Sequence, residues 1–278
     1  MKKIKEQFAA VLFGFTALAS VLCVILICVF LFASGIPAMR EIGVLDFLTG
    51  RQWAPGNVPA SYGIFTMIIG SIYVTAGAIL IGVPVGILTA VYLSYFCPKR
   101  VYKPLKAAVE LLAGIPSVVY GFFGMIVLVP VFRSSLFTAA VLLGIMILPT
   151  IISISESAIA AVPKSYYEGA MGLGASHERS VFFSVLPAAK SGILAGVILG
   201  VGRALGETMA VVMVAGNQAL MPRGLFKGVR TLTANIVLEM GYAEGLHREA
   251  LIATAVVLFV LIMIINITFS CVKRRGES

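Results

Sequence analysis

The sequence predicts an all-α polytopic membrane protein that crosses the bilayer with six transmembrane helices. Of its 278 residues, 60% are hydrophobic and only 12% are charged, whereas charged residues make up about 25% of a soluble globular domain. The mean hydropathy of +1.04 points the same way. A span needs about 20 mostly apolar residues. Six segments qualify, at roughly 8–33, 62–96, 107–131, 136–160, 192–215 and 250–272.

The first apolar segment follows three lysines, Lys2, Lys3 and Lys5, and could be taken for a secretory signal. Its apolar run of about 25 residues exceeds the 7–15 residues of a signal's hydrophobic region, so we expect a retained span. We assign 1–60 to this helix and an outer loop. Residues 61–272 form the core with five transmembrane helices, and 273–278 form a basic cytoplasmic tail.

Lys and Arg are unevenly distributed between the segments that join the spans. The amino end, the 97–106 loop, the 161–191 loop and the tail carry three, four, three and three of them. These thirteen compare with seven on the opposite side. Cytoplasmic loops carry the excess of positive charge, so we expect both termini in the cytoplasm. The net charge of +9 has the same explanation, and no base-reading motif accompanies it.

Neither metal nor disulfide chemistry is expected. The four cysteines form no spaced set with the two histidines, and Cys23 and Cys28 lie in the first apolar segment, where cysteine behaves as a small hydrophobe. The chain also lacks the G-x-x-x-x-G-K-[ST] loop that cradles ATP phosphates. If transport is driven by ATP, the nucleotide and its Mg²⁺ must bind to another chain.

Glycines recur at four-residue spacing in two spans. Gly82 and Gly86 lie in the second span, and Gly192, Gly196 and Gly200 lie in the fifth. Such spacing lets membrane helices approach closely. We interpret the first pair as helix packing.

The fifth span carries two charged residues, Arg203 and Glu207. On a regular helix both fall on the face that holds its glycines, within an arc of roughly 80°. Counted from the cytoplasmic end near residue 192, Arg203 lies about 16 Å deep, close to the midplane. A charge at that depth needs a partner, so we expect an Arg203–Glu207 ion pair.

Two interpretations of this pair remain open. In the structural interpretation it only docks helices. In the functional one, Arg203 faces the substrate pathway and meets an anion, and Glu207 holds the guanidinium when the pathway is empty. Ionisable residues within a membrane favour the second interpretation, and a planar guanidinium suits a tetrahedral oxyanion. Thr208 and Ser117 are further pathway candidates, although packing would also explain Ser117.

The 161–191 loop is less polar than a solvated loop. Two short helices fit it, separated at Gly172–Gly174, where a positive φ is inexpensive. Ser176 is the expected N-cap of the second helix. The apolar side chains predict contact with a partner protein or, alternatively, with the bilayer surface. They are Tyr166, Tyr167, Met171, Phe182 and Phe183.

A spaced set of residues in this loop points to a known family. The set is Glu168, Gly169 and Ala170, then Gly174, then Leu186 and Pro187. It resembles the EAA loop of ABC-importer permeases, with Gly169 in place of an alanine and Ser184 where isoleucine is usual. The resemblance implies an ABC-importer type I permease (MetI-like) fold. It also implies that the loop docks in a cleft of a cytoplasmic ATPase.

Two longer stretches make the resemblance more specific. Residues 112–124 and 186–211 are similar to phosphate-specific permeases, and the ending Gly-Glu-Thr-Met-Ala-Val at 206–211 is typical of the PstC type. The resemblance covers about 60–215. It implies a non-catalytic permease subunit that translocates inorganic phosphate across the bacterial plasma membrane by alternating access.

The family also implies an assembly. Its members would be a second permease of the PstA type, two ATPase subunits of the PstB type that bind ATP and Mg²⁺, and an extracytoplasmic phosphate-binding protein of the PstS type. Three alternatives stay open: a permease for another oxyanion such as sulfate or molybdate, an ion-gradient-driven transporter acting alone, and a structural membrane scaffold.

Overall fold

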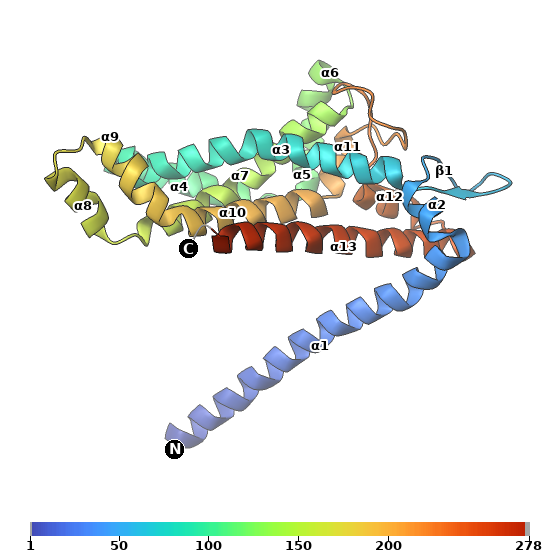
Figure 1. The fold of residues 1–278 in the computed structure, drawn as a ribbon, viewed down its shortest axis with the longest axis horizontal. Coiled ribbons are helices and arrows are strands. Elements are labelled where there is room, and N and C mark those ends of the chain that lie inside the picture. The colour runs from blue at the N-terminus through green and yellow to red at the C-terminus, as the bar shows by residue number, and fades with distance from the viewer. Residues whose placement is uncertain (1, 276–278) are drawn as a thin grey trace.

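The computed structural model describes the backbone of residues 2–275 and the side chains of residues 9–268, 270 and 271. Helices α3, α7, α10 and α13 run side by side along the long axis of the molecule (Figure 1). The helices are α1 (Lys2–Ile42), α2 (Val44–Thr49), α3 (Phe65–Val91), α4 (Lys99–Gly114), α5 (Ser117–Phe123), α6 (Val129–Phe132), α7 (Leu136–Ala160), α8 (Lys164–Gly172), α9 (His177–Ser180), α10 (Leu186–Gly206), α11 (Met209–Val214), α12 (Leu232–Glu239) and α13 (Gly245–Arg275). Two short antiparallel strands, β1 (Trp53–Ala54) and β2 (Ser61–Tyr62), pair in the loop before α3.

The predicted all-α membrane fold is confirmed. Within the described residues, five helical segments are long and apolar enough to cross a membrane, and a bent pair of helices makes a sixth. The five are Ala9–Ile42, Phe65–Phe96, Leu136–Ala160, His177–Gly206 and Gly245–Thr268, and the bent pair is Lys99–Gly114 with Ser117–Phe132. The predicted second, fourth and sixth spans lie close to these bounds.

The third predicted span, 107–131, is not one straight helix. α4 ends directly before Ile115, which is extended (φ −71°, ψ 126°), and the axis turns by 98° into α5. The ring of a proline disfavours a helical conformation in the preceding residue, so the helix breaks ahead of Pro116. The Tyr120 hydroxyl donates a hydrogen bond across the break to the Leu112 carbonyl at 2.8 Å. The third predicted span is therefore a bent pair of helices.

The fifth predicted span, 192–215, is wrong at both ends. One helical segment runs from His177 through α9, the π-helical turn Val181–Val185 and α10 to Gly206. It then breaks at Glu207 and Thr208, and α11 follows. The predicted second helix of the 161–191 loop is therefore the first part of this long helix.

Three π-helical turns lie in or beside the long helices, each shortly before a proline. They are η1 (Tyr92–Phe96), η2 (Gly124–Leu128) and η3 (Val181–Val185), and each ends two residues before a proline. In η3, the Leu186 N–H bonds to the carbonyl five residues earlier, on Val181. Proline has no N–H and clashes with the carbonyl four residues before it. The wider turn relieves this clash and lets Pro187 lie inside a long helix.

Glycines bring α3 and α10 close to α7. A Cβ added at Gly82 would lie 2.7 Å from the Ile147 side chain and 2.8 Å from the Gly144 carbonyl oxygen. A Cβ added at Gly200 would lie 2.9 Å from the Ile151 side chain. Gly86, Gly192 and Gly196 also pack against α7. The prediction of close helix contact is confirmed, and the glycine face of α10 is occupied by α7.

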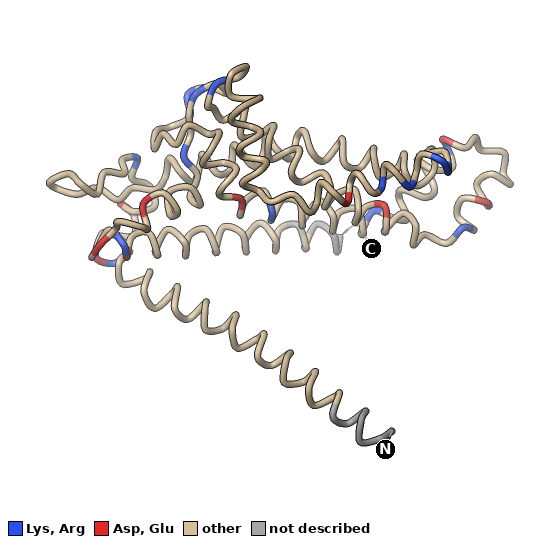
Figure 2. Tube along the Cα trace, turned by 180° about the vertical axis from the view of Figure 1, so that it is seen from behind, with Lys and Arg blue, Asp and Glu red and all other residues tan. Residues whose placement is uncertain are grey.

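α1 packs on α13 at its carboxyl end and diverges from the bundle toward its amino end (Figure 1). None of its most apolar stretch is buried by the rest of the chain. The amino-terminal lysines and the basic side chains of 273–278, used to predict sidedness, lie outside the described side chains. Elsewhere, Lys and Arg lie mainly toward the ends of the long helices (Figure 2). The division at residue 60 and the cytoplasmic location of both termini stay predictions.

A buried cluster of polar side chains lies at the end of the bundle farthest from α8 and connects several elements there. The Glu239 carboxylate accepts hydrogen bonds from Trp53 Nε1 at 2.8 Å and from Arg230 Nη1 at 2.6 Å. His247 Nε2 lies 2.9 Å from the same carboxylate. A buried carboxylate needs such partners. The cluster joins the β1–β2 hairpin, α12 and α13.

Candidate functional site

Arg203 lies in the last turn of α10 and is half-buried. Its Nη1 donates to the Thr150 hydroxyl of α7 at 3.3 Å. Among the described side chains, no carboxylate oxygen lies within 4.0 Å of its guanidinium. A guanidinium held by one neutral hydroxyl group retains most of its donors for an anion.

The predicted Arg203–Glu207 ion pair does not form. α10 ends at Gly206, and Glu207 is extended (φ −68°, ψ 133°), so the helical spacing that would align the two charges stops before Glu207. The Glu207 carboxylate instead accepts hydrogen bonds from the N–H groups of Thr208 (3.1 Å) and Ala210 (3.3 Å). These groups lie at the start of α11, where a negative charge is stabilising. Glu207 therefore caps α11.

A cavity of about 10 Å³ lies beside this cap, with room for about one water molecule. Glu207 lines it together with four hydroxyl residues from α3 and from the start of α12 with its N-cap: Ser71, Thr75, Thr231 and Thr233. The Thr233 hydroxyl donates to the Glu207 carbonyl at 3.0 Å. The break after α10 is thus surrounded by polar groups rather than by hydrocarbon alone.

The other two predicted pathway residues lie at helix breaks. Thr208 lies in the break after α10, and its hydroxyl donates to the Gly206 carbonyl at 3.2 Å. Ser117 is the first residue of α5, directly after Pro116 and three residues before Tyr120. The structure instead gives Arg203 a hydrogen-bond partner in Thr150, a residue that the sequence did not suggest.

Two helix breaks and one proline within a continuous helix occur in or beside α5, α7 and α10. Pro116 precedes α5, Pro149 lies inside α7 next to Thr150, and Glu207 follows α10. α11, which starts after the last break, packs on both α5 and α7. Irregular backbone at membrane depth is tolerated where it is buried in protein or lines a path. Broken helices of this kind form the substrate sites of several transporters.

The 161–191 loop folds largely as predicted. α8 ends before Gly174, which has φ 87°, the left-handed conformation that glycine adopts without strain. The Ser176 hydroxyl accepts the Arg179 N–H at 3.4 Å, which confirms Ser176 as the N-cap of α9. Glu168 and Gly169 are exposed on α8, and Pro187 is exposed at the start of α10. Ala170 and Leu186 are half-buried.

Two side-chain contacts that sequence reasoning missed hold the loop together. The Tyr167 hydroxyl lies 2.7 Å from His177 Nδ1, and the His177 ring packs edge-on against Phe96 at the end of η1. The Ser184 hydroxyl donates to the Tyr166 carbonyl at 2.9 Å. Ser184, which departs from the family pattern, thus fixes η3 to α8. An isoleucine there could not make this bond.

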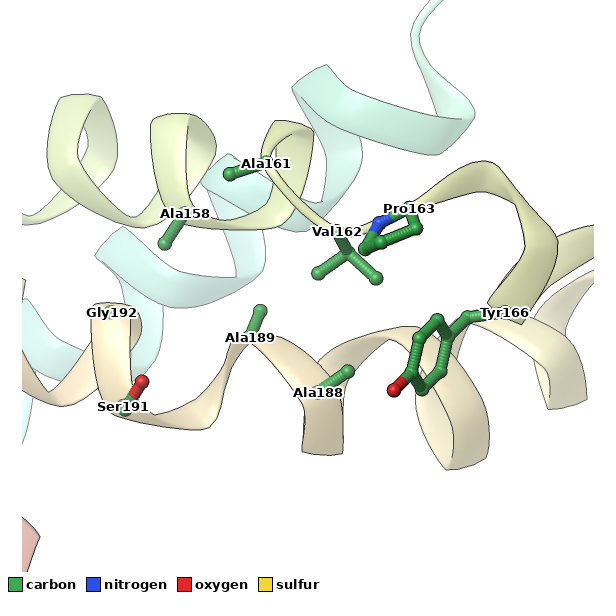
Figure 3. A pocket seen from close by; sticks show the side chains of 9 residues that line it. All are labelled: Ala158, Ala161, Val162, Pro163, Tyr166, Ala188, Ala189, Ser191 and Gly192. Atoms are coloured by element: carbon green, nitrogen blue, oxygen red, sulfur yellow. The ribbon is translucent and has the colours of Figure 1, made fainter. Parts of the chain in front are cut away.

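The loop leaves apolar surface uncovered, as predicted, except at Tyr167, which is half-buried. The exposed members of the predicted set are Tyr166, Met171, Phe182 and Phe183. At the base of the loop, a groove of about 340 Å³ separates the end of α7 from the start of α10 (Figure 3). Its walls carry small side chains such as Ala158 and Ala189, with Tyr166 at one end (Figure 3).

Metal-ligating side chains do not cluster within the part of the chain that the structure describes. It contains no group of three or more His, Cys, Asp and Glu residues that could hold an ion. His177 contacts Tyr167, and His247 contacts Glu239.

Comparison with known proteins shows the family to which the chain belongs. The family described as binding-protein-dependent transport system inner membrane component matches residues 82–275. The chain is 37% identical to the probable ABC transporter permease protein YqgH of Bacillus subtilis, over 93% of this chain and 88% of that protein. It is 36% identical to the phosphate transport system permease protein PstC of Mesorhizobium japonicum, over 92% and 87%.

Solved structures show the same fold. A chain of the inward-facing MetNI methionine ABC transporter superimposes with a TM-score of 0.64 at 19% identity, over 77% of this chain and 97% of that one. A chain of a bacterial alginate ABC transporter gives 0.64 at 15% identity, over 93% and 94%. The expected MetI-like importer permease fold is confirmed.

Proposed function

The chain belongs to the family of binding-protein-dependent transport system inner membrane components, and from this premise we propose that it is the PstC-type permease subunit of an ATP-driven importer of inorganic phosphate. Relatives named phosphate transport system permease protein PstC are 33–36% identical to this chain over 79–92% of its length. The observation within the molecule that carries the proposal is Arg203, a cation without a carboxylate partner among the described residues.

In this proposal, Arg203 meets phosphate during its passage. A phosphate anion entering a low-dielectric pathway loses hydration, and a charge-assisted hydrogen bond to guanidinium compensates for part of that loss. Because Thr150 is the hydrogen-bond partner of Arg203 and is neutral, binding of phosphate breaks no ion pair. Ser117 and Thr208 would supply hydroxyl groups at the other helix breaks. Because the site holds a single cation, its affinity for phosphate would stay low enough for release.

The long helix from His177 to Gly206 supports coupling between the 161–191 loop and Arg203. At 1.5 Å per residue, His177 and Arg203 are about 39 Å apart along one helical segment, which includes the π-helical turn η3. Movement of the loop would therefore reach the guanidinium along this one segment. We assign Glu168, Gly169, Ala170, Gly174, Leu186 and Pro187 to the contact with the ATPase.

The transporter would contain this chain and a PstA-type permease, two PstB-type ATPases that hold ATP and Mg²⁺, and a PstS-type binding protein outside. Both termini and the loop would face the cytoplasm of the bacterial cell. ATP-driven closure of the ATPases would move the loop and open the pathway outward, where the binding protein releases phosphate. The chain itself would catalyse no reaction.

Uptake of radiolabelled phosphate into vesicles that contain the assembled transporter tests this proposal. We expect uptake that requires ATP and that unlabelled phosphate suppresses more strongly than sulfate or molybdate. Arg203→Gln should lower uptake at least tenfold while the complex still assembles, about the effect of one lost charge-assisted hydrogen bond. Arg51→Gln, which alters an exposed arginine, serves as the matched control.

Each part of the proposal can fail separately. Equal uptake by Arg203→Gln and Arg51→Gln would remove Arg203 from the pathway. If sulfate or molybdate suppressed the uptake of labelled phosphate more strongly than unlabelled phosphate does, the substrate would be that other oxyanion. Uptake that needs an ion gradient and no ATPase subunits would replace the importer with a gradient-driven transporter.

A further inference from the structure

A second polar cavity, separate from the surroundings of Arg203, lies at the α8 end of the bundle. It measures about 690 Å³, within the range of small-molecule sites. Four elements enclose it: η1 after α3, the start of α4, the end of α7 and the start of α8. Its polar lining includes Tyr95, Lys99, Tyr102, Lys103, Glu156 and Lys164.

The buried carboxylate in this cavity is already neutralised. The Glu156 side chain is 10% exposed, and its Oε1 accepts the Tyr102 hydroxyl at 2.5 Å and Lys106 Nζ at 3.3 Å. This contact fixes α4 to α7. It also means that Glu156 does not offset the positive charge of the other lining residues.

Three lysines therefore dominate the electrostatics of the cavity. Lys99, Lys103 and Lys164 are exposed, and none has a carboxylate within 4.0 Å among the described side chains. Glu168 supplies the remaining carboxylate of the lining. An anion that enters the cavity meets an excess of positive charge drawn from two separate helices.

The amino-terminal ends of two helices add to the positive electrostatic potential of the cavity. α4 begins at Lys99 after Pro98, and α8 begins at Lys164 after Pro163. Proline offers no polar side chain, and neither helix has a side-chain cap. The first N–H groups of a helix and its dipole favour an anion. Both uncapped starts lie at the cavity, since both lysines line it.

We propose that this cavity binds a phosphate group, presented by an anionic phospholipid headgroup or as inorganic phosphate. The surroundings favour the lipid. α4 has no buried residue and exposes Val101 and Leu105 beside its lysines, a surface on which acyl chains can lie. Basic pockets between membrane helices on the cytoplasmic side bind lipid headgroups. This proposal rests on the proposed function for one point only, namely that the α8 end of the bundle faces the cytoplasm.

An occupied cavity links the start of α8 to α4. The phosphate oxygens would bridge Lys164 on α8 to Lys99 and Lys103 on α4, while Tyr102 and Glu156 hold α4 to α7. The position of the 161–191 loop relative to the bundle then depends on the occupant. The lipid composition of the membrane, or the anion concentration inside, would thereby set how readily the loop moves.

Binding is tested on the assembled complex in nanodiscs. In the first arm, phosphatidylglycerol is titrated into phosphatidylcholine discs, and native mass spectrometry counts the lipids that the complex retains. Each lysine near a headgroup contributes about a fivefold gain in affinity, so Lys103→Gln with Lys164→Gln should weaken retention about 25-fold. Arg223→Gln with Lys227→Gln, an equal charge loss at exposed residues far from the cavity, should not change retention.

In the second arm, calorimetry measures binding of inorganic phosphate in pure phosphatidylcholine discs, with Arg203→Gln to remove the pathway site. If the Lys103→Gln, Lys164→Gln double variant loses phosphatidylglycerol and the control variant does not, the occupant of the cavity is the lipid. A phosphate signal that the same double variant abolishes assigns the free anion. Behaviour identical to the Arg223 and Lys227 control in both arms overturns the proposal. Neither arm measures uptake, so failure of the transport proposal gives a different result.

Discussion

Replacing Gly82 with alanine tests the close packing of α3 against α7. The new Cβ would lie 2.8 Å from the Gly144 carbonyl oxygen, whereas ordinary contact begins at 3.4 Å. The shortfall is 0.6 Å, and the obstructing atom belongs to the backbone, so no side-chain rotation can relieve it. The two helices must separate along a seam that also contains Gly86 and Ile151.

The cost can be isolated with a matched variant. Overpacking a tight contact costs about 1–3 kcal/mol. Against this, alanine favours a helix over glycine by about 1 kcal/mol. Gly14→Ala, on the exposed face of α1, gains the same helix preference and meets no atom within 4 Å. The helix preference cancels between the two variants, so their difference should equal the packing cost of about 1–3 kcal/mol.

Unfolding of the purified chain in mixed micelles, titrated with sodium dodecyl sulfate and followed by circular dichroism, measures this difference. Gly82→Ala should unfold at a lower detergent fraction than Gly14→Ala, which should unfold at the same fraction as the natural chain or at a higher one. Equal midpoints for the two variants would refute the reasoning. The α3–α7 seam would then be loose enough to absorb a methyl group.

Three further substitutions probe the loop and the distal cluster. Ser184→Ala removes the bond between η3 and α8, so it should cost about 1 kcal/mol and lower phosphate uptake per ATP hydrolysed; an unchanged ratio would contradict this. Gly169→Ala meets no atom within 4 Å and should raise the thermal unfolding midpoint through a gain of about 0.5–1 kcal/mol in α8. Glu239→Gln removes the carboxylate charge that pairs with Arg230 and should destabilise the chain by about 3 kcal/mol in the detergent titration, whereas exposed Glu244→Gln should change little.

The spans could be predicted because hydrophobicity is a local property of the sequence. The break in the third span could not be predicted from Pro116 alone, because Val83 and Leu148 also precede prolines and yet stay helical. It was missed because the apolar run continues on both sides of Pro116. The spacing of Gly82 and Gly86 indicated packing, but only the structure identified α7 as the neighbour.

The contacts of charged residues were harder to predict because they join segments distant in sequence. Glu239 is bound by Trp53, which is 186 residues away. Glu156 is bound by Tyr102, which is 54 residues away. Nothing in either local sequence signals these partners. Composition indicates that a buried carboxylate needs a partner, and the tertiary structure determines which one it has.

The Arg203–Glu207 prediction failed because it assumed that the helix continues. In water-poor surroundings, the first N–H groups of α11 need acceptors as much as a guanidinium does. Glu207 lies next to those groups along the chain, so leaving the helix at Gly206 brings its carboxylate to them. Arg203 therefore has the Thr150 hydroxyl as its one side-chain partner among the described residues, which supports the proposed contact with an anion. The failure of the ion pair therefore strengthens the argument that Arg203 serves transport rather than helix docking.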